Sequence, residues 1–365
     1  MKPVTLMMKH ASNLFADEAE RGRFVEALTE GVGRESAILI LKDRPEIKVF
    51  PHLPALPWQP NWVMRIDPEF RAAKHALYEK GAYYSLDFSS VFSASAMLAI
   101  PNSVRRVLDL CASPGGKAIF AWRAFNPEVL ACNEAIRKRT GALISNLHRC
   151  GIERSVVWSA DPSVYARKFP KAFDLLIVDA PCSGQSLLAK GDEAPGCWHP
   201  EMIEMNVGRQ RRIIGNAAQC VRPGGHLLYA TCTFSVKENE KVAAWLMQQM
   251  PDFEAVPVPH LEAFRSPHAD FPCYRLFPHQ GFGAGAFTCL LRRNGEPEEH
   301  WPSIEEFRGF WRFGNAAPVR DEVEPVVPER FSAPEDRPKH YPRRKPVKPM
   351  RKKPEPGGRR NRRRR

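Results

Sequence analysis

Two cysteines stand in settings where a thiol could do chemistry. Cys182 belongs to the segment Asp179–Gly184 and Cys232 belongs to Tyr229–Phe234, and an apolar run leads into each segment. A thiolate near an acid and a cationic cofactor can add to an electrophilic ring carbon, which activates a pyrimidine for methylation at carbon. Most cysteines are instead small buried hydrophobes, and we interpret five others in that way: Cys132, Cys150, Cys220, Cys273 and Cys289.

A glycine-containing turn could bind a polar or anionic ligand. It consists of Cys111, Ala112, Ser113, Pro114, Gly115, Gly116 and Lys117. Glycines where a strand bends into a helix let the backbone approach a ligand closely, and the free amides there favour an anionic group. The dinucleotide fingerprint G-x-G-x-x-G is missing, and Ala118 after Lys117 does not fit a phosphate loop. A tight turn with no ligand is the other interpretation that these residues allow.

Three acidic residues follow successive predicted strands, namely Glu134, Asp161 and Asp179. An acid after the second strand is the usual partner of ribose hydroxyls in nucleoside-binding sheets, although single acids often cap helices. Three such acids beside a glycine turn indicate a nucleoside-containing cofactor. Because the NAD fingerprint is missing, S-adenosylmethionine fits this pattern better than NAD does.

Alternating strands and helices from Val104 to about Arg293 would position these groups. The predicted strands are Val104–Leu110, Glu128–Glu134, Ser155–Asp161, Phe173–Asp179 and His226–Thr233. The predicted helices include Ala135–Cys150, Met202–Val221, which Arg222–Gly225 should end, and Lys237–Met250. This alternation predicts a doubly wound parallel α/β sheet with its site at the carboxyl ends of the strands. The last two strands are neighbours in such a sheet, so Cys182 and Cys232 should face one cleft.

The positive charge of the chain is concentrated at one end. The 365 residues carry a formal net charge of +13, but Arg337–Arg365 alone holds fifteen Lys or Arg and one acid. The rest of the chain is therefore close to neutral. From Ala316 onward ten of fifty residues are proline, so we expect a disordered tail that binds RNA phosphates without sequence specificity.

The composition argues against membrane, secreted and zinc proteins. No apolar run approaches the roughly 18 residues of a membrane span, and the first residues contain too short an apolar core for a signal peptide. The nine cysteines include no C-x-x-C pair, and their odd number argues against a secreted disulfide framework. We expect a cytoplasmic monomer with free thiols and with neither a metal nor a membrane partner.

The N-terminal region is predicted to be a small α+β module. Ala19–Thr29 has helical spacing, and both Ala37–Leu41 and Ile47–Phe50 look like strands. Trp58 and Trp62 lie in a proline-punctuated loop, where a core role is favoured over base stacking. We predict four parts: a subdomain at 1–85, a catalytic domain at 86–295, a connecting segment at 296–315 and the tail at 316–365.

Four motifs occur in order along the chain: DLCASPGGK, FDLLIVDAPCSG, RPGGHLLYATCTF with KENE after it, and RLFPHQGFGAGAF. Together they resemble the RsmB/NOP-type (Sun, NSUN) family of RNA cytosine-5 methyltransferases. The resemblance covers roughly residues 20–293, and it is specific because two spaced cysteine motifs match together. It implies a Rossmann-like S-adenosylmethionine-dependent methyltransferase sheet that carries a small N-terminal RNA-binding subdomain.

The resemblance also implies a role for each matching residue. Cys232 would be the nucleophile that attacks carbon 6 of cytosine, and Asp179 would hydrogen-bond ring nitrogen 3. Cys182 would assist loss of the proton from carbon 5 and release of the methylated base. The cofactor site would be lined by residues 111–117, Glu134, Asp161 and Asp179. In DNA cytosine methyltransferases the nucleophile follows a proline, which would favour Cys182, so the opposite assignment of the two thiols is the alternative.

We therefore predict an RNA methyltransferase that forms 5-methylcytosine, with ribosomal RNA as the favoured substrate and transfer RNA as the alternative. The target cytosine must be unpaired or extruded, because a thiol cannot reach either ring carbon inside a stacked helix. The rival from another class is a non-catalytic RNA-binding assembly factor that keeps a degenerate methyltransferase fold. Loss of the two thiols, of Asp179 or of the glycine turn would favour that rival, but all are present.

Overall fold

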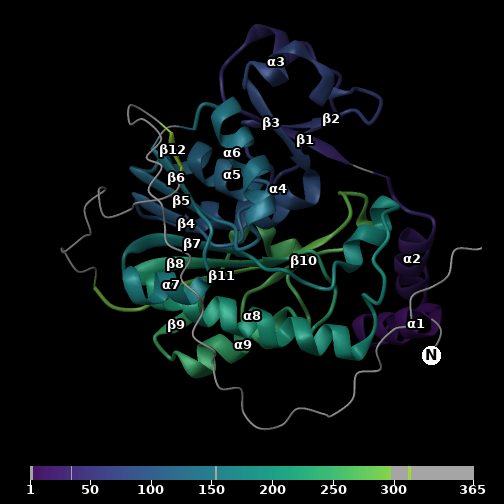
Figure 1. Cartoon of the computed structure of the whole chain (residues 1–365). Coiled ribbons are helices and arrows are strands. Elements are labelled where there is room, and N and C mark those ends of the chain that lie inside the picture. Colours follow the sequence, from purple (N-terminus) through teal and green to yellow (C-terminus); the bar gives the residue numbers. More distant parts are fainter. Residues whose placement is uncertain (1–2, 34, 153, 297–310, 314–365) are drawn as a thin grey trace, which may run out of the picture. The chain divides into compact units, whose positions relative to one another are not determined.

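The computed structural model describes residues 3–33, 35–152, 154–296 and 311–313 (Figure 1). They belong to a unit that spans Met1–Glu322, and a second unit, Val323–Arg365, lies outside the described residues. The predicted tail at 316–365 and most of the predicted connecting segment at 296–315 also lie outside them. Across the described ranges, every helix is too short or too polar to span a bilayer.

A large mixed β-sheet forms the centre of the first unit, with the strand order β10-β11-β8-β7-β4-β5-β6-β12 and β9 paired to β11. Its five central strands are β4 Arg106–Asp109, β5 Val129–Asn133, β6 Ser155–Trp158, β7 Phe173–Asp179 and β8 Val221–Thr231. These five run parallel to one another. The outer strands β9 Phe253–Ala255, β10 Tyr274–Leu276, β11 Ala286–Arg293 and β12 Trp311–Phe313 pair antiparallel.

The five strands predicted from Val104 onward are confirmed, and so is the pairing of the last two. The chain order reverses at β4, which lies between β5 and β7, so the carboxyl ends of β4 and β7 flank the switch point where ligands bind such sheets. The sheet departs from a purely parallel one at its edges. The Arg222–Gly225 turn, expected to separate a helix from a strand, lies inside β8, where the register with β7 shifts between Phe173 and Leu175.

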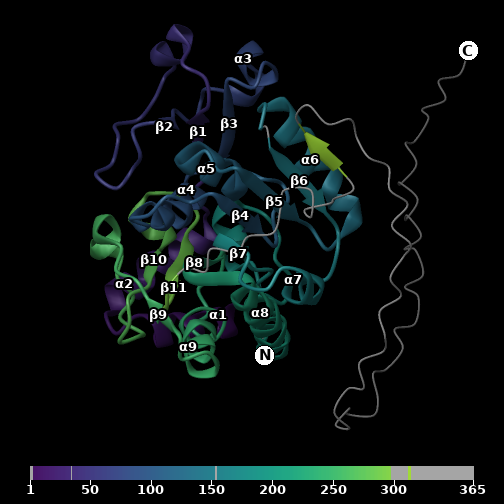
Figure 2. The same ribbon diagram turned by 90° about the vertical axis from the view of Figure 1, so that its left-hand side faces the viewer.

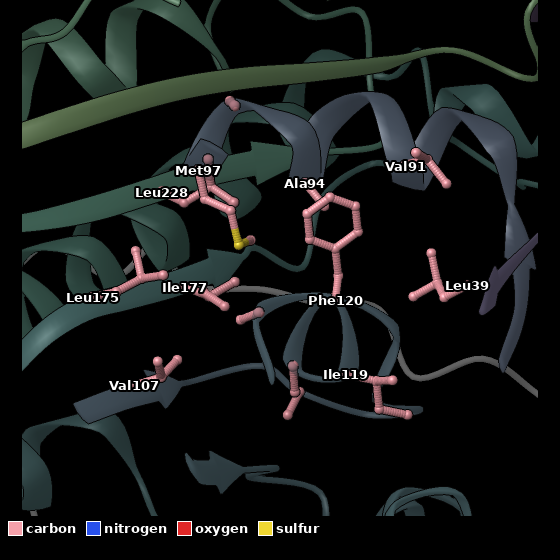
Figure 3. Close-up of a cluster of buried hydrophobic side chains, with 14 of the residues drawn as sticks. Leu39, Val91, Ala94, Met97, Val107, Ile119, Phe120, Leu175, Ile177 and Leu228 are labelled. Atoms are coloured by element: carbon pink, nitrogen blue, oxygen red, sulfur yellow. The ribbon is translucent and has the colours of Figure 1, made fainter. Parts of the chain in front are cut away.

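Helices cover both faces of the large sheet. One face carries α4 Phe88–Ser95, α5 Gly116–Phe125 and α6 Thr140–Arg149, and the other carries α7 Pro162–Lys168, α8 Pro200–Cys220 and α9 Glu240–Gln249 (Figure 1). Figure 3 shows the core under the first face, where Phe120 of α5 points toward Ala94 and Ile177 lies near Met97. The central strands are buried on both sides, which explains why Phe173–Asp179 is an almost continuous apolar run.

A second, three-stranded antiparallel sheet has the order β2-β1-β3. Its strands are β1 Ser36–Ile40, β2 Val63–Ile66 and β3 Tyr83–Asp87, and α4 and α5 lie between it and the large sheet (Figure 2). The prediction of a strand at Ile47–Phe50 is wrong. Pro45 fixes the backbone at the start of a short 3-10 helix, η1 Pro45–Val49, and β2 supplies the missing strand instead.

The aromatic loop between η1 and β2 packs inward, as predicted. Trp58 stacks on Phe88 at a ring distance of 4.9 Å, and Trp62 meets Phe120 edge-on at 4.7 Å. Two N-terminal helices complete the unit, α1 Pro3–Leu14 and α2 Glu18–Thr29, of which only α2 was predicted. The remaining short helices are η2 Ala72–Lys74, α3 Ala76–Glu79, η3 Ala96–Ala99, η4 Arg137–Arg139, η5 Gln185–Lys190, η6 Pro259–Phe264 and η7 Pro278–Gln280.

Candidate active site

The loops after β7 and β8 bring the two singled-out cysteines together. The Sγ atoms of Cys182 and Cys232 are 3.3 Å apart, and both residues are half-buried. The pairing of β7 with β8 places the loops side by side, and the amide of Ser186 donates a hydrogen bond to the carbonyl of Cys232 at 3.2 Å. The prediction that both thiols share one place in the fold is confirmed.

The two thiols have opposite acid–base tendencies. The hydrogen bond between the two thiols lowers the pKa of Cys232, although burial and the Asp179 carboxylate oppose this. The same hydrogen bond raises the pKa of Cys182, and burial adds to the effect. The directions of these two shifts favour Cys232 as the more acidic thiol of the pair. Since thiolates and not thiols are nucleophiles, this arrangement favours attack by Cys232.

An ion pair between Asp179 and Lys117 lies beside the thiols. The ammonium group of Lys117 donates to Asp179 Oδ2 at 2.7 Å, and the Lys117 side chain is 8% exposed against 41% for Asp179. Lys117 stands in the first turn of α5, and Asp179 is the last residue of β7. The buried Lys117 thus holds the Asp179 carboxylate in place, while the exposed part of the Asp179 side chain remains open to a ligand.

The predicted glycine turn connects β4 to α5 at the switch point. Gly115 precedes α5 with a φ of +116°, a backbone conformation that favours glycine, and its Cβ would lie 3.3 Å from Leu143. The turn is fixed from η4, because Ser113 donates to the carbonyl of Arg139 at 3.0 Å and Arg139 donates back to Ser113 at 2.9 Å. Burial raises the pKa of Cys111, so that thiol stays protonated.

Two of the predicted acids at the strand ends differ in their surroundings. Glu134 is buried after β5, where it accepts the amide of Ile136 at 2.9 Å and pairs with Arg139 at 3.2 Å. Asp161 caps α7 through the amide of Ser163 and forms an ion pair with Arg212. The cap gives Asp161 a structural role, and both partners of the ion pair are about half exposed. Within the described part of the chain, no group of three or more His, Cys, Asp or Glu is arranged to hold a metal ion.

Asp109 is a buried acid that the sequence analysis did not single out. It ends β4, is 1% exposed and accepts the amide of Cys111 at 3.2 Å. Burial and the nearby Asp179 carboxylate raise the pKa of Asp109 to about 7. Its position as the first residue of the DLCASPGGK motif was the available signal.

Glu238 was also missed, and it holds the loop that carries Cys182. Its fully buried carboxylate accepts the amide of Ser183 at 2.8 Å, the hydroxyl of Ser183 at 2.7 Å and the side chain of Gln210 at 3.1 Å. The KENE motif had marked this residue without indicating a partner. Asn239, the next residue, holds the other loop by donating to the carbonyl of Thr233 at 2.9 Å.

The fold resembles that of solved methyltransferase structures. The structure titled NSun6 from Pyrococcus horikoshii with SFG matches 80% of this chain and 98% of its own length, with a TM-score of 0.66 and 18% identity. A methyltransferase homolog protein from the same organism matches 80% of this chain and all of its own length, with a TM-score of 0.61 and 23% identity. Identities this low support a shared fold and nothing finer.

Sequence relatives extend the comparison to a family. Ribosomal RNA small subunit methyltransferase F of Escherichia fergusonii is 35% identical over 204 residues, which are 55% of this chain and 43% of that protein. The same-named protein of Escherichia coli (strain SMS-3-5 / SECEC) is 34% identical over the same shares. The matched part of the chain thus spans less than half the length of these relatives. A family model described as 16S rRNA methyltransferase RsmB/F matches residues 96–292, more than half of the chain. The chain belongs to the RsmB/F methyltransferase family.

Proposed function

We propose that this protein is an S-adenosylmethionine-dependent RNA methyltransferase that forms 5-methylcytosine, with ribosomal RNA as its substrate. The observation that carries the proposal is the contact between the Cys182 and Cys232 thiols, 3.3 Å apart, beside the Lys117–Asp179 ion pair. A methyl transfer to oxygen or nitrogen needs no thiol. Two thiols of opposite acid–base tendency match a reaction that needs a nucleophile and a proton acceptor in turn.

The residues around the glycine turn suit the predicted cofactor. Its methionine carboxylate would meet the start of α5, where the first amides of a helix lack intrahelical acceptors. The buried Glu134 would accept the ribose hydroxyls, and Asp109 offers a carboxyl group in the same part of the site. SFG, the compound named with the NSun6 structure, is an analogue of this cofactor, which supports the same choice. When bound, S-adenosylmethionine supplies the methyl group.

Cys232 would open the reaction as the nucleophile. Its thiolate forms a bond to carbon 6 of the cytosine, and the displaced electron pair makes carbon 5 nucleophilic. Ring nitrogen 3 needs a hydrogen-bond donor as this charge develops, and Asp179, which Lys117 holds in place, would supply it in its carboxylic acid form. Carbon 5 is then ready to accept a methyl group.

Cys182 would close the reaction. After methylation carbon 5 carries both a methyl group and a hydrogen, and the adduct breaks down only when a base takes that proton. Cys182 would first give up its own proton to solvent, and its thiolate would then take the proton from carbon 5. The electron pair of the C–H bond re-forms the double bond between carbons 5 and 6 and expels the Cys232 thiolate. The 3.3 Å contact keeps both sulfurs near the same two ring carbons.

Ribosomal RNA is proposed as the substrate because the curated relatives carry that substrate in their names. The N-terminal subdomain at 1–85 is proposed to help bind it, and the basic residues at 337–365 are proposed to add loose, salt-sensitive attachment. Bisulfite sequencing of total RNA from a deletion strain tests the substrate. A cytosine lost from the signal in transfer RNA instead would move the assignment to the alternative.

Two variants test the chemistry itself. With Cys232→Ala, transfer of labelled methyl groups to RNA should vanish while cofactor binding survives. With Cys182→Ala, a covalent RNA–protein species should accumulate, because the adduct forms but cannot break down. Cys220→Ala, which removes a buried thiol from the far end of α8, is the matched control.

Three outcomes would contradict the proposal. Full methyl transfer by Cys232→Ala would refute the assignment of the nucleophile, and a covalent species in that variant would exchange the roles of the thiols. An unaltered protein that binds RNA but transfers no methyl group to total RNA would instead support the non-catalytic assembly factor.

A further inference from the structure

The sulfur atoms of Cys182 and Cys232 lie close enough for a small movement to bond them. Their Sγ atoms are 3.3 Å apart. A disulfide bond is about 2.05 Å long, so the sulfurs would have to approach by about 1.3 Å. Modest rotations of both side chains about their Cα–Cβ bonds supply this approach, because each sulfur then moves only about half of it. The proposed reaction uses the two sulfurs in turn and makes no use of a bond between them.

Hydrogen bonds next to the thiol pair fasten the two loops to each other. Ser183 and Thr233, the residues that directly follow the two cysteines, are joined through their hydroxyl groups at 2.7 Å. The amide of Ser186 donates to the carbonyl of Cys232 itself at 3.2 Å. Glu238 fixes Ser183 further by accepting both its amide and its hydroxyl. A bond between the sulfurs would therefore join loops that are already held together, with little movement of the backbone.

The surroundings of the nine cysteines favour oxidation of this pair. Cys182 and Cys232 are half-buried, whereas six others are fully buried, namely Cys132, Cys150, Cys197, Cys220, Cys273 and Cys289. Burial raises the pKa of each of those six thiols, which keeps them in the unreactive protonated form. A site that admits a cytosine ring to both sulfurs also admits a hydroperoxide, which is smaller.

Hydrogen peroxide is the simplest oxidant of this class, and the atoms balance in two steps. First, one sulfur attacks a peroxide oxygen: an S–O bond forms, the O–O bond breaks, and the thiol proton leaves with the hydroxide as water. Second, the neighbouring sulfur attacks the resulting sulfenic acid: an S–S bond forms, and the hydroxyl group leaves with the second thiol proton as water. A dithiol reductant reverses the change, since it becomes a disulfide itself and returns both protons to the cysteines.

We propose that Cys182 and Cys232 form an oxidation switch: a hydroperoxide joins the two sulfurs in a disulfide that stops the reaction, and a thiol reductant restores it. This inference rests on the proposed function, because the disulfide removes the nucleophile and the proton acceptor of that reaction together. A sulfenic acid without a neighbouring thiol is oxidised further to a sulfinic acid, which thiols do not reduce. The second sulfur captures the sulfenic acid first and so keeps the oxidation reversible.

The test treats the full chain with hydrogen peroxide in the absence of RNA, removes the excess with catalase and blocks the remaining thiols with iodoacetamide in denaturant. Peptide mass spectrometry should find the Cys182 peptide joined to the Cys232 peptide, and dithiothreitol should separate them. In unblocked samples the lost fraction of methyl transfer should equal the cross-linked fraction, and activity should return after reduction. Cys220→Ala, which removes a buried thiol, is the matched control and should behave like the unaltered protein.

A second variant shows what the neighbouring sulfur does. In Cys182→Ser the cross-link cannot form, so Cys232 should accumulate a sulfinic acid that dithiothreitol does not remove. This variant is followed by mass alone, because Cys182 belongs to the proposed catalytic pair.

Three results would overturn the inference. The first is the absence of the cross-link after peroxide treatment, whether or not activity is lost. The second is a sulfinic acid at Cys232 of the unaltered protein that forms as fast as in Cys182→Ser. The third is a cross-linked protein that still transfers methyl groups. Because the cross-link is detected by mass, failure of the proposed function would show in the methyl-transfer assay of the untreated protein and leave the oxidation test readable.

Discussion

Removal of the Glu238 carboxylate should loosen the loop that carries Cys182. Glu238→Ala deletes the acceptor of three hydrogen bonds, two from Ser183 and one from Gln210. Two of the three donors have a second acceptor, since the Ser183 hydroxyl also contacts Thr233 at 2.7 Å and Gln210 also donates to the carbonyl of Pro181 at 3.0 Å. The amide of Ser183 loses its partner outright.

The loss of stability in Glu238→Ala can be worked out from these hydrogen bonds. A buried donor left without an acceptor costs about 1–3 kcal/mol, and the two weakened bonds and the small cavity add to this. Burial raises the pKa of Glu238, which shows that its charge is costly to bury. Removing this buried charge offsets part of the stability that the lost hydrogen bonds cost. We expect Glu238→Ala to lower the free energy of unfolding by about 2–3 kcal/mol and Glu238→Gln, which keeps an acceptor for the amide, by about 1 kcal/mol.

Urea unfolding at pH 7.5 measures both variants. Glu204→Ala is the matched control, because Glu204 pairs with Lys237 on the surface and such pairs contribute about 0–1 kcal/mol. Glu238→Ala should also accumulate the covalent RNA adduct expected of Cys182→Ala, since the second thiol would be displaced. A loss of stability no larger than that of Glu204→Ala would refute the argument that Glu238 holds the loop.

Three further predictions concern the framework. Glu240→Ala leaves Arg275 as a buried charge without its carboxylate, since both side chains are 2% exposed. Urea unfolding should show a free energy of unfolding lower by about 3–5 kcal/mol. A decrease below about 1 kcal/mol would contradict a buried ion pair. Gly285→Ala should destabilise by about 2 kcal/mol or more, because φ is +99° and the new Cβ would lie 2.7 Å from Phe234. A neutral variant would contradict the close contact. Burial lowers the pKa of His226 to about 4, below its usual 6.5, so the unfolded chain binds the extra proton as pH falls. The contribution of His226 to the free energy of unfolding is fully present above pH 6.5 and declines toward pH 4. Between pH 7.5 and pH 5, the free energy of unfolding should therefore fall by about 2 kcal/mol more in the unaltered protein than in His226→Gln.

The central strands of the large sheet could be predicted from the sequence because their residues form apolar runs. Strands β4 to β8 are buried on both faces, so each appears as an apolar run that is hard to mistake. The site loops follow from that sheet, because parallel strands present their carboxyl ends at one edge. The contact of Cys182 with Cys232 was predictable for this reason.

The sequence did not reveal what depends on partners far away in the chain. Ile47–Phe50 has the composition of a strand, but the sheet edge it would need is taken by β2, and Pro45 starts a 3-10 helix instead. Glu238 looks like any helix-start acid until the fold brings Ser183, fifty-five residues earlier, to within 2.8 Å. Lys190 looks like a loop lysine until Asp87 is placed beside it.

Three consecutive residues at the start of α9 hold the two loops that carry Cys182 and Cys232. Glu238 holds the loop after β7, and Asn239 holds the loop after β8 through Thr231 at 2.6 Å and Thr233 at 2.9 Å. Glu240 pairs with Arg275, which in turn donates to the carbonyl of Phe234 at 3.0 Å, two residues beyond Cys232. The thiols themselves contribute little to their own separation, because a thiol–thiol hydrogen bond is weak. Their 3.3 Å contact is therefore imposed by this buried polar network, which gives the proposed chemistry a nucleophile and a proton acceptor already in register before RNA arrives.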